Sequence, residues 1–328
     1  MRVGLDGFAI PGRPLDPFET LAWVSEQGLD GYFFGLLTRV SPTLDPGYLG
    51  ELRARADDLG LYLEVGVGTV NPTRFASSPA VLALGDGQYR PGFERLLRAG
   101  RAFGGRELRV DMGGPAARFD SGPAWVAQLD ATRDFLLSVA PLCRDLDCRL
   151  DVETHADATT RELAWLVEEV GPDVAGVCLD TANVLCLAEE PVAAAGRVAP
   201  YVHQTHAKDA IVYRAPEGLV RQSRPCGDGC VDWPALLGRL AEPAPDLNLS
   251  IEDHRGIFAV RAEPGAPELA ALEEMARRAE ARVARGELIA PDAWESIPWE
   301  EHALARLSAS VGYLRGLLER GRAAGWPA

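Results

Sequence analysis

Residues 149–180 read RLDVETHADATTRELAWLVEEVGPDVAGVCLD and give the clearest indication of the fold. It begins with a short apolar run at residues 149–152 and continues with an amphipathic segment at residues 160–170, which Gly171 terminates. A second apolar run follows at residues 177–179. A short strand, a helix and another short strand in this order are typical of a βαβ unit, in which the two strands lie parallel.

Short apolar runs alternate with helical segments in the rest of the chain. Eight runs are predicted as strands, at residues 3–5, 32–34, 61–65, 108–110, 149–152, 177–179, 201–204 and 247–251. Helices are predicted at residues 18–27, 48–59, 92–103, 125–146, 160–170 and 267–285. This alternation predicts an α/β protein with a (β/α)8 TIM barrel. A doubly wound parallel sheet would show the same alternation, so the positions of the polar residues have to decide between the two folds.

Polar residues that suit a cation follow four successive strands. They are Glu153, Asp180, His206 and Glu252. The carboxyl ends of barrel strands converge on one open face, so we expect these side chains to lie together, which favours the barrel. Three carboxylates and one imidazole predict a site for a divalent metal, with Mn²⁺ preferred and Mg²⁺, Co²⁺ or Zn²⁺ as alternatives. Each residue taken singly would be read as a surface charge or a salt-bridge partner.

The segments around these four residues resemble the metal-binding strand ends of the xylose isomerase-like TIM barrels, the sugar isomerase/epimerase group. They are Val152–His155, Cys178–Asn183, His206–Asp209 and Ile251–Glu252. The turn at residues 227–229, followed by Val231–Trp233, resembles the loop and helix start before the last strand of that group. The resemblance covers about residues 1–285 and is strongest from 150 to 255. It implies a metal-dependent enzyme from a superfamily of ketose epimerases, isomerases, dehydratases, deglycosidases and endonuclease IV.

The resemblance implies an isomerase or epimerase that acts on a keto-sugar or polyol, and the predicted metal site suits an enediolate intermediate. A divalent ion that binds a carbonyl oxygen and a neighbouring hydroxyl stabilises the enediolate that proton loss produces. Glu153 or Glu252 can take the proton, and the other can return it. The alternative is a lyase that uses the same enolisation, either a C-glycoside deglycosidase-like enzyme acting on 3-oxo-glycosides or a dehydratase.

Two neighbours of the ligands are candidate catalytic groups. His155 is predicted as an acid/base at the mouth of the barrel, with a hydrogen-bonding role in its loop as the alternative. Lys208 is predicted to balance the charge of the site or to bind a substrate oxygen, with a salt bridge to Asp209 as the alternative.

Other residues at the strand ends are candidate substrate contacts. The predicted contacts are Asn183, His254, Arg255 and Trp233. The resemblance places Asn183 where the ketose 3-epimerases have a histidine that helps to hold the substrate, and this departure weakens the epimerase interpretation. Three acids from the first strands are predicted to bind hydroxyl groups or to form surface salt bridges: Asp6, Glu64 and Asp111.

The composition limits the partners. The chain is 47% hydrophobic and 25% charged, which is typical of a soluble globular protein. A net charge of -15 opposes binding to nucleic acid and to anionic membranes, and leaves small carbohydrates as the expected partners. The chain also has only five histidines, which argues against a zinc-cluster DNA-repair enzyme. The sequence has neither a secretion signal nor a run of about 20 apolar residues, so we expect a cytoplasmic protein.

A helical extension, residues 286–328, is predicted to follow a catalytic barrel domain of residues 1–285. Its main helix is expected at Glu301–Arg320, with an apolar stripe formed by Val311, Leu314, Leu317 and Leu318. Such a helix packs across the bottom of the barrel or reaches a partner subunit in a homo- or hetero-oligomer.

Overall fold

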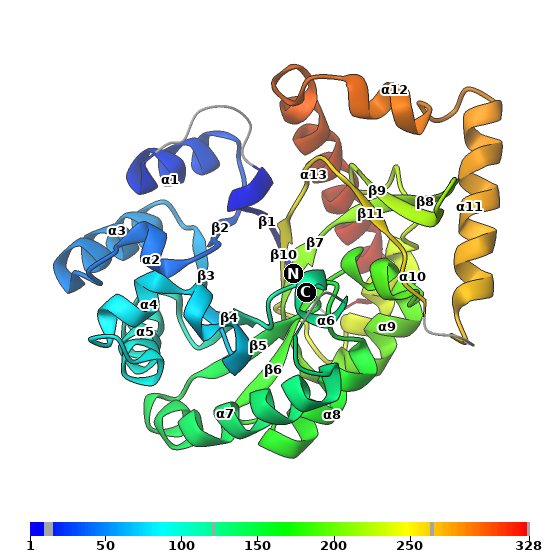
Figure 1. Ribbon diagram of the computed structural model, residues 1–328. Helices are drawn as coiled ribbons and strands as arrows, with labels where there is room; N and C mark the ends of the chain where they lie inside the picture. The colour runs from blue at the N-terminus through cyan, green and yellow to red at the C-terminus, as the bar shows by residue number, and fades with distance from the viewer. Residues whose placement is uncertain (10–15, 120–121, 263–265, 327–328) are drawn as a thin grey trace.

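Eight parallel strands close into a barrel in the computed structural model, which describes residues 1–9, 16–119, 122–262 and 266–326 (Figure 1). The strands follow the order β1-β10-β7-β6-β5-β4-β3-β2 around the barrel. Their bounds are β1 (Arg2–Asp6), β2 (Gly31–Phe34), β3 (Tyr62–Thr69), β4 (Glu107–Asp111), β5 (Arg149–Glu153), β6 (Ala175–Asp180), β7 (Val202–Ala207) and β10 (Asn248–Ile251). Each of the eight predicted strands overlaps one of these, so the α/β class and the TIM barrel are confirmed.

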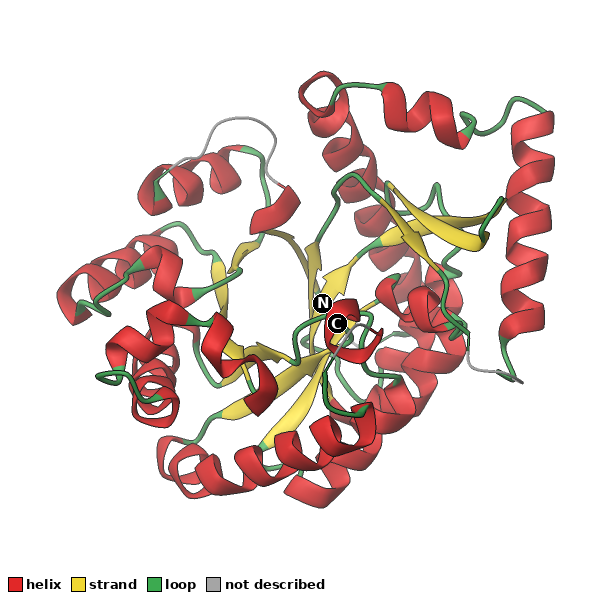
Figure 2. Cartoon of the chain, in the orientation of Figure 1, coloured by secondary structure: helices red, strands yellow, loops and turns green. Residues whose placement is uncertain are grey.

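Helices surround the barrel, as the red ribbons outside the yellow strands show in Figure 2. The outer helices are α1 (Pro17–Glu26), α3 (Pro46–Asp58), α5 (Tyr89–Gly104), α7 (Trp125–Leu146), α8 (Thr160–Val170), α9 (Pro191–Val198), α10 (Trp233–Leu240) and α13 (Trp299–Ala323). The remaining helical elements are α2 (Leu37–Val40), α4 (Pro79–Leu84), α6 (Pro115–Phe119), α11 (Leu269–Ala284), α12 (Pro291–Ser296) and the 3-10 turns Gly7–Ala9, Pro72–Ser77, Asn183–Leu187 and Ala199–Tyr201. No described helix combines the length and the apolar content that crossing a membrane requires.

Local sequence signals fix where the strand ends fall. At the start of α8, the Thr159 hydroxyl accepts a hydrogen bond from the Glu162 N–H, and the Glu162 carboxylate accepts one from the Thr159 N–H. This capping box satisfies backbone groups that the first helical turn leaves unpaired. The helix ends at Gly171, whose φ of 105° suits glycine. Strand β6 begins four residues later and delivers Asp180 to its last position.

The C-terminal helix α13 packs on the outside of β1 and β10. Three of the four residues of its predicted apolar stripe, Leu314, Leu317 and Leu318, are buried in the same hydrophobic core as the barrel strands. Val311 is only partly buried. The stripe therefore covers the seam where the last strand meets the first, rather than the bottom of the barrel. A domain boundary at residue 285 and assembly through this helix remain predictions.

An antiparallel sheet that the sequence analysis missed stands between β7 and the end of the chain. It consists of β8 (Asp209–Ala215), β9 (Gly218–Arg224) and β11 (Ile257–Ala259), in the order β11-β9-β8. Strand β8 begins two residues after β7, so the sheet extends the carboxyl end of the barrel. The predicted helix at residues 267–285 forms as α11 and packs on β8, not on the barrel.

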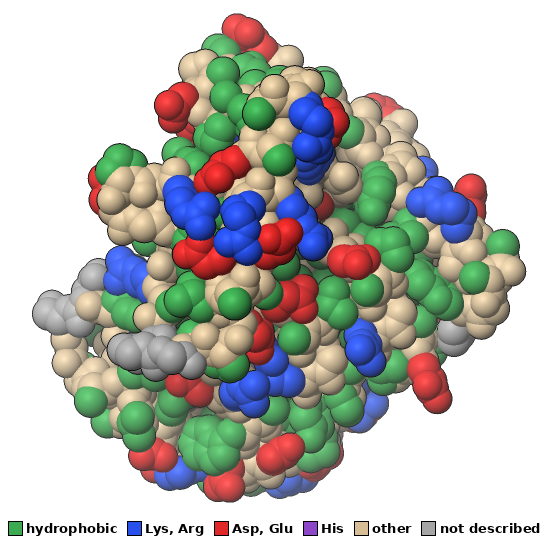
Figure 3. Space-filling view, turned by 90° about the vertical axis from the view of Figure 1, so that its right-hand side faces the viewer, with side chains coloured by type: hydrophobic (Ala, Val, Ile, Leu, Met, Phe, Trp, Pro, Cys, Tyr) green, Lys and Arg blue, Asp and Glu red, His purple; other side chains and the backbone are tan. Residues whose placement is uncertain are grey.

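The surface beside α11 is mixed in charge. Figure 3 looks onto the side of the molecule where α11 lies in Figure 1, and it shows acidic and basic side chains interspersed. Ion pairs such as Arg277–Glu274 and Arg282–Asp228 contribute to this pattern. Exposed pairs of this kind add little stability.

Candidate metal centre

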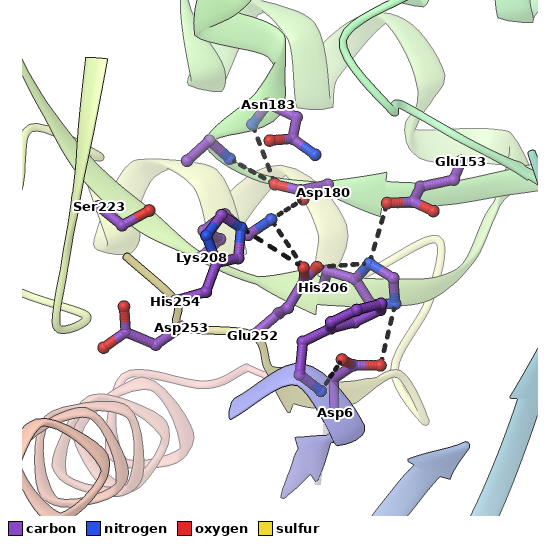
Figure 4. A network of polar contacts seen from close by, with 12 residues as sticks. Asp6, Glu153, Asp180, Asn183, His206, Lys208, Ser223, Glu252, Asp253 and His254 are labelled. Atoms are coloured by element: carbon purple, nitrogen blue, oxygen red, sulfur yellow. Dashed lines mark hydrogen bonds and ion pairs between the residues drawn. The ribbon is translucent and has the colours of Figure 1, made fainter. Parts of the chain in front are cut away.

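The four residues predicted to bind a metal come together at the carboxyl end of the barrel (Figure 4). Glu153 and Asp180 are the last residues of β5 and β6. His206 is the second-last residue of β7, and Glu252 directly follows β10. All four are buried, and one potential ligand atom from each lies within 4.8 Å of the others.

The spacing of these atoms fits a divalent cation. His206 Nδ1 lies 3.1 Å from Glu153 Oε1 and 2.9 Å from Glu252 Oε2. Ligand atoms in neighbouring positions of an octahedral ion, at about 2.1 Å from it, are about 3 Å apart. Glu252 Oε2 is buried and points at His206 Nδ1 inside the cluster, where a cation could take the place of the proton between them. Oxygen donors with one imidazole suit Mg²⁺, Mn²⁺ or Zn²⁺, and the preference for Mn²⁺ remains a prediction.

Arg109 on β4 is a neighbour of Glu153 that the sequence analysis missed. Its Nε donates a 2.6 Å hydrogen bond to Glu153 Oε2, and its Nη2 contacts the same oxygen. Burial raises the pKa of Glu153, but Arg109, with His155 and His206, outweighs burial and lowers that pKa. Glu153 therefore stays ionised. A basic residue inside an apolar strand was the available signal, because buried arginines usually have an acidic partner.

Lys208 forms ion pairs with two of the four residues. Its Nζ lies 2.7 Å from Asp180 Oδ2 and 3.0 Å from Glu252 Oε1. Burial would lower the pKa of Lys208, but the two carboxylates raise it. Burial would likewise raise the pKa of Glu252, which Lys208 and His206 hold well below its ordinary value. The alternative of a salt bridge between Lys208 and Asp209 is wrong.

Asp209 instead organises the loop before α10. Its carboxylate accepts hydrogen bonds from the N–H groups of Gly227 and Val231, and from the indole Nε1 of Trp233 at 2.9 Å. Trp233 is fully buried in the hydrophobic core, and its one polar atom already has a partner. We therefore correct the prediction that Trp233 contacts substrate: its indole anchors a loop.

Asp6, at the end of β1, faces the other side of the His206 ring. Asp6 Oδ2 lies 3.7 Å from His206 Nε2, whereas His206 Nδ1 faces Glu153 and Glu252. Burial is the main reason that the pKa of Asp6 is raised to about 6. A carboxylate behind a metal-binding imidazole orients the ring and makes it a better ligand. This position favours an orienting role for Asp6 over the predicted binding of substrate hydroxyls.

We expect Asp6→Asn to weaken divalent-metal binding by about 10- to 100-fold, because the ring loses its anionic support. Calorimetric titration with Mn²⁺ measures this change. Asp57→Asn, on the exposed face of α3, provides the control and should bind as the wild type does. Equal affinities of the Asp6 variant and the wild type would remove Asp6 from the centre.

Two predicted site residues, His155 and His254, are histidines near the mouth of the barrel. His155 stands beside the loop after β4, and its buried Nδ1 has no hydrogen-bond partner among the described residues. His254 Nε2 lies 3.7 Å from Glu252 Oε1, and burial, with Lys208, lowers its pKa. Both imidazoles are close enough to keep their predicted roles as proposals.

Asn183 and Arg255 are engaged by other parts of the chain. The Asn183 N–H donates to Asp180 Oδ1 at 2.9 Å, and its Oδ1 accepts a hydrogen bond from Arg221. Arg255 is exposed and contacts Glu295 in α12. The structure thus brings Asn183 to the cluster and directs Arg255 away from it.

Glu64 lies toward the amino end of the barrel, not at the mouth. It lines a cavity of about 740 Å³ there and accepts hydrogen bonds from Asn248 Nδ2 and Ser250 Oγ. Burial raises its pKa from 4.5 to about 7. The folded protein therefore holds this proton more tightly than the unfolded chain does. The resulting stabilisation is complete below pH 4.5 and is lost as the pH rises through about 7.

Above pH 7 we expect Glu64→Gln to be more stable than the wild type by roughly 2–3 kcal/mol in the free energy of unfolding. The variant should therefore unfold at a higher temperature. Glutamine cannot ionise; its oxygen can accept the hydrogen bond from Asn248 Nδ2, and its NH₂ group can donate to Ser250 Oγ, which reverses the second bond. The advantage should vanish below pH 4.5. Thermal unfolding of both proteins between pH 4 and 9 measures it, and an advantage that does not change with pH would contradict a raised pKa.

Comparisons with known proteins agree on the fold. A family model described as xylose isomerase-like TIM barrel matches residues 21–279. A 3-oxo-isoapionate decarboxylase from Pectobacterium atrosepticum is 27% identical over 262 residues, which cover 77% of this chain and 85% of that protein. An uncharacterized Escherichia coli protein, YihM, is 32% identical over 97 residues, 30% of each chain. A structure of D-psicose 3-epimerase, determined in the presence of D-fructose, aligns with a TM-score of 0.59 and 17% identity, covering 87% of this chain and all of that one.

Proposed function

Because the chain belongs to the xylose isomerase-like TIM barrel family, we propose that it is a divalent-metal-dependent enzyme that enolises a keto-sugar or polyol. The reaction proposed first is isomerisation or epimerisation through an enediolate. The observation that carries this proposal is the buried cluster of Glu153, Asp180, His206 and Glu252. The bound ion would supply Lewis-acid stabilisation of negative charge that develops on the substrate oxygens.

Glu252 is the better candidate for the proton acceptor. Its Oε1 contacts Lys208 and also lies 3.7 Å from Nε2 of His254, an imidazole whose lowered pKa suits it to exchange protons. Glu153 has one oxygen toward His206 and the other held by Arg109, a guanidinium that does not lose its proton. We assign Glu252 to move the substrate proton and Glu153 to hold the metal.

A lyase that uses the same enolisation is the second candidate, and two observations favour it. Epimerisation needs a proton acceptor on one face of the substrate carbon and a proton donor on the other. Of the two candidate carboxylates, Glu153 is hydrogen-bonded to Arg109 and so is poorly suited to either task. The relative aligned over most of the chain is named as a decarboxylase of a 3-oxo acid. Loss of carbon dioxide from a 3-oxo acid leaves the electron pair as an enolate, so the same site could stabilise it.

The two candidates differ in their products. We would incubate Mn²⁺-loaded protein in D₂O with free ketoses, 3-oxo-glycosides and 3-oxo sugar acids. Deuterium incorporation with sugar interconversion supports the isomerase, whereas release of an aglycone, water or carbon dioxide without interconversion supports the lyase. Absence of both deuterium exchange and product from every substrate would contradict the proposed enolisation.

A further inference from the structure

We propose that Arg221 binds a carboxylate of the substrate, so that the enzyme acts on a keto-sugar acid rather than on a neutral keto-sugar. This inference rests on the proposed function for the identity of the site. It starts from a buried positive charge that has no negative partner in the described part of the chain.

Arg221 lies on β9 and is only 1% exposed. Its three hydrogen bonds all go to neutral acceptors: Nε to Cys186 Sγ, Nη1 to Ser223 Oγ and Nη2 to Asn183 Oδ1. Phe258 packs on the guanidinium, 4.3 Å from ring centroid to Cζ. No carboxylate of the described residues forms an ion pair with it. Burying a charge without a partner is costly, so such a group needs another explanation.

Two buried cations that contact the proposed metal ligands, in contrast, have acidic partners. Arg109 is paired with Glu153, and Lys208 with Asp180 and Glu252. A bound divalent ion, together with Arg109 and Lys208, would neutralise the negative charge of the three ligand carboxylates. Arg221 lies beside this cluster and bonds only to neutral acceptors, so a ligand of the cluster could neutralise it. Arg224 also bonds to neutral acceptors, but from the other face of the strand.

One residue, Asn183, connects Arg221 to the proposed metal ligand Asp180. Asn183 accepts its hydrogen bond at 2.6 Å and donates its own N–H to Asp180 at 2.9 Å. Ser223, the other side-chain oxygen that Arg221 contacts, lies on the same side of the cluster as Lys208 and His254, opposite Glu153 (Figure 4). Arg221 therefore flanks the metal site on the side of Lys208.

The neighbouring buried arginine on β9 faces the other way. Side chains alternate along a strand, so Arg221 and Ser223 share one face of the sheet, and Gln222 and Arg224 share the opposite one. Arg224 Nη2 donates to Gln222 Oε1 and to the Ile289 carbonyl, and its guanidinium packs on Trp294. Arg224 thus provides a control that matches Arg221 in burial but not in direction.

The geometry of a guanidinium favours a carboxylate. Arginine has five N–H groups, and the three bonds of Arg221 leave one N–H on each terminal nitrogen. Two N–H donors are what a carboxylate accepts in a bidentate pair with arginine. A phosphate shares this chemistry, so the experiment has to separate the two anions.

The test is calorimetric binding to Mn²⁺-loaded protein with matched probes. Hydroxypyruvate and dihydroxyacetone form one pair, and D-fructuronate and D-fructose the other. In each pair, a carboxylate replaces a hydroxymethyl group. For at least one pair we expect the wild type to prefer the acid by about 30-fold or more, the scale of a buried charged hydrogen bond. The preference should fall below about 3-fold in Arg221→Met and persist in Arg224→Met.

The opposite results would overturn the proposal. These are equal binding of acid and neutral probes by the wild type, or a preference that survives in Arg221→Met. Tighter binding of D-fructose 6-phosphate than of either acid would assign the site to phosphate instead. Because binding is measured apart from turnover, a preference for acids in a protein that fails to enolise any substrate would refute the proposed function and keep the role of Arg221.

Thermal unfolding separates a binding role from a structural one. Arg306 is also buried, but it is paired with Asp253. We expect Arg306→Met to lower the unfolding temperature, because Asp253 loses its counter-ion. Arg221→Met should unfold at or above the wild-type temperature, because it removes an unpaired charge. A loss in Arg221→Met as large as that in Arg306→Met would show that this arginine supports the fold and would contradict our proposal.

Discussion

Replacing Glu252 with glutamine is expected to lower turnover by roughly 10³-fold or more, the upper part of the range for general acid–base groups. Glu252 directly follows β10 and presents one oxygen to His206 and the other to Lys208. Glutamine keeps the shape of the side chain but has no negative charge, so it neither accepts the substrate proton nor holds a cation well. Steady-state rates with the substrate that the D₂O experiment identifies measure the effect.

The fold should survive this replacement. Lys208 retains its 2.7 Å contact with Asp180, so Glu252→Gln does not leave a buried charge alone. Circular dichroism and thermal unfolding check this point. Glu51→Gln, the same exchange at an exposed position of α3, controls for the substitution and should leave turnover unchanged. Wild-type turnover in Glu252→Gln would remove Glu252 from the mechanism.

Removing divalent metal is expected to abolish activity and to lower thermal stability. Without a cation, Glu153, Asp180 and Glu252 repel one another across a buried space. A ligand present at 100 times its dissociation constant stabilises the folded state by about 2.7 kcal/mol, so metal-loaded and chelated samples should differ measurably. Metal analysis, activity and thermal unfolding before and after chelation provide the measurements. Addition of Mn²⁺ should restore both properties, and Mg²⁺, Co²⁺ and Zn²⁺ test the preference.

His206 makes metal uptake dependent on pH. Burial would lower its pKa, but Glu153 and Glu252 raise it well above the ordinary value of 6.5. Metal must displace the proton from Nδ1, so the affinity for metal should fall as the pH falls.

Full activity in a protein shown to contain no metal would contradict the metal-dependent mechanism on which both of these predictions depend.

The barrel and the ligand cluster were predictable because both follow from local rules. Alternation of strands and helices indicates parallel pairing, and parallel strands bring their carboxyl ends together. Glu153, Asp180, His206 and Glu252 could therefore be found from their places after apolar runs alone. The β8–β9 hairpin was missed even though residues 210–213 and 219–220 are apolar on both sides of the two-residue turn at Pro216–Glu217. The spacing between His206 and Glu252 predicts only one helix with a long loop.

The sequence by itself determined the barrel, its strand order along the chain and the chemical type of the site. It did so because hydrophobic periodicity and the ends of strands are properties of neighbouring residues. Tertiary structure alone decided which charges are paired. Arg109 contacts Glu153 from the adjacent strand, Asp6 contacts His206 from two strands away around the barrel, and Arg221 contacts Asn183 from a hairpin. These contacts join residues far apart in the chain, and the energy of a buried charge depends on what surrounds it in space.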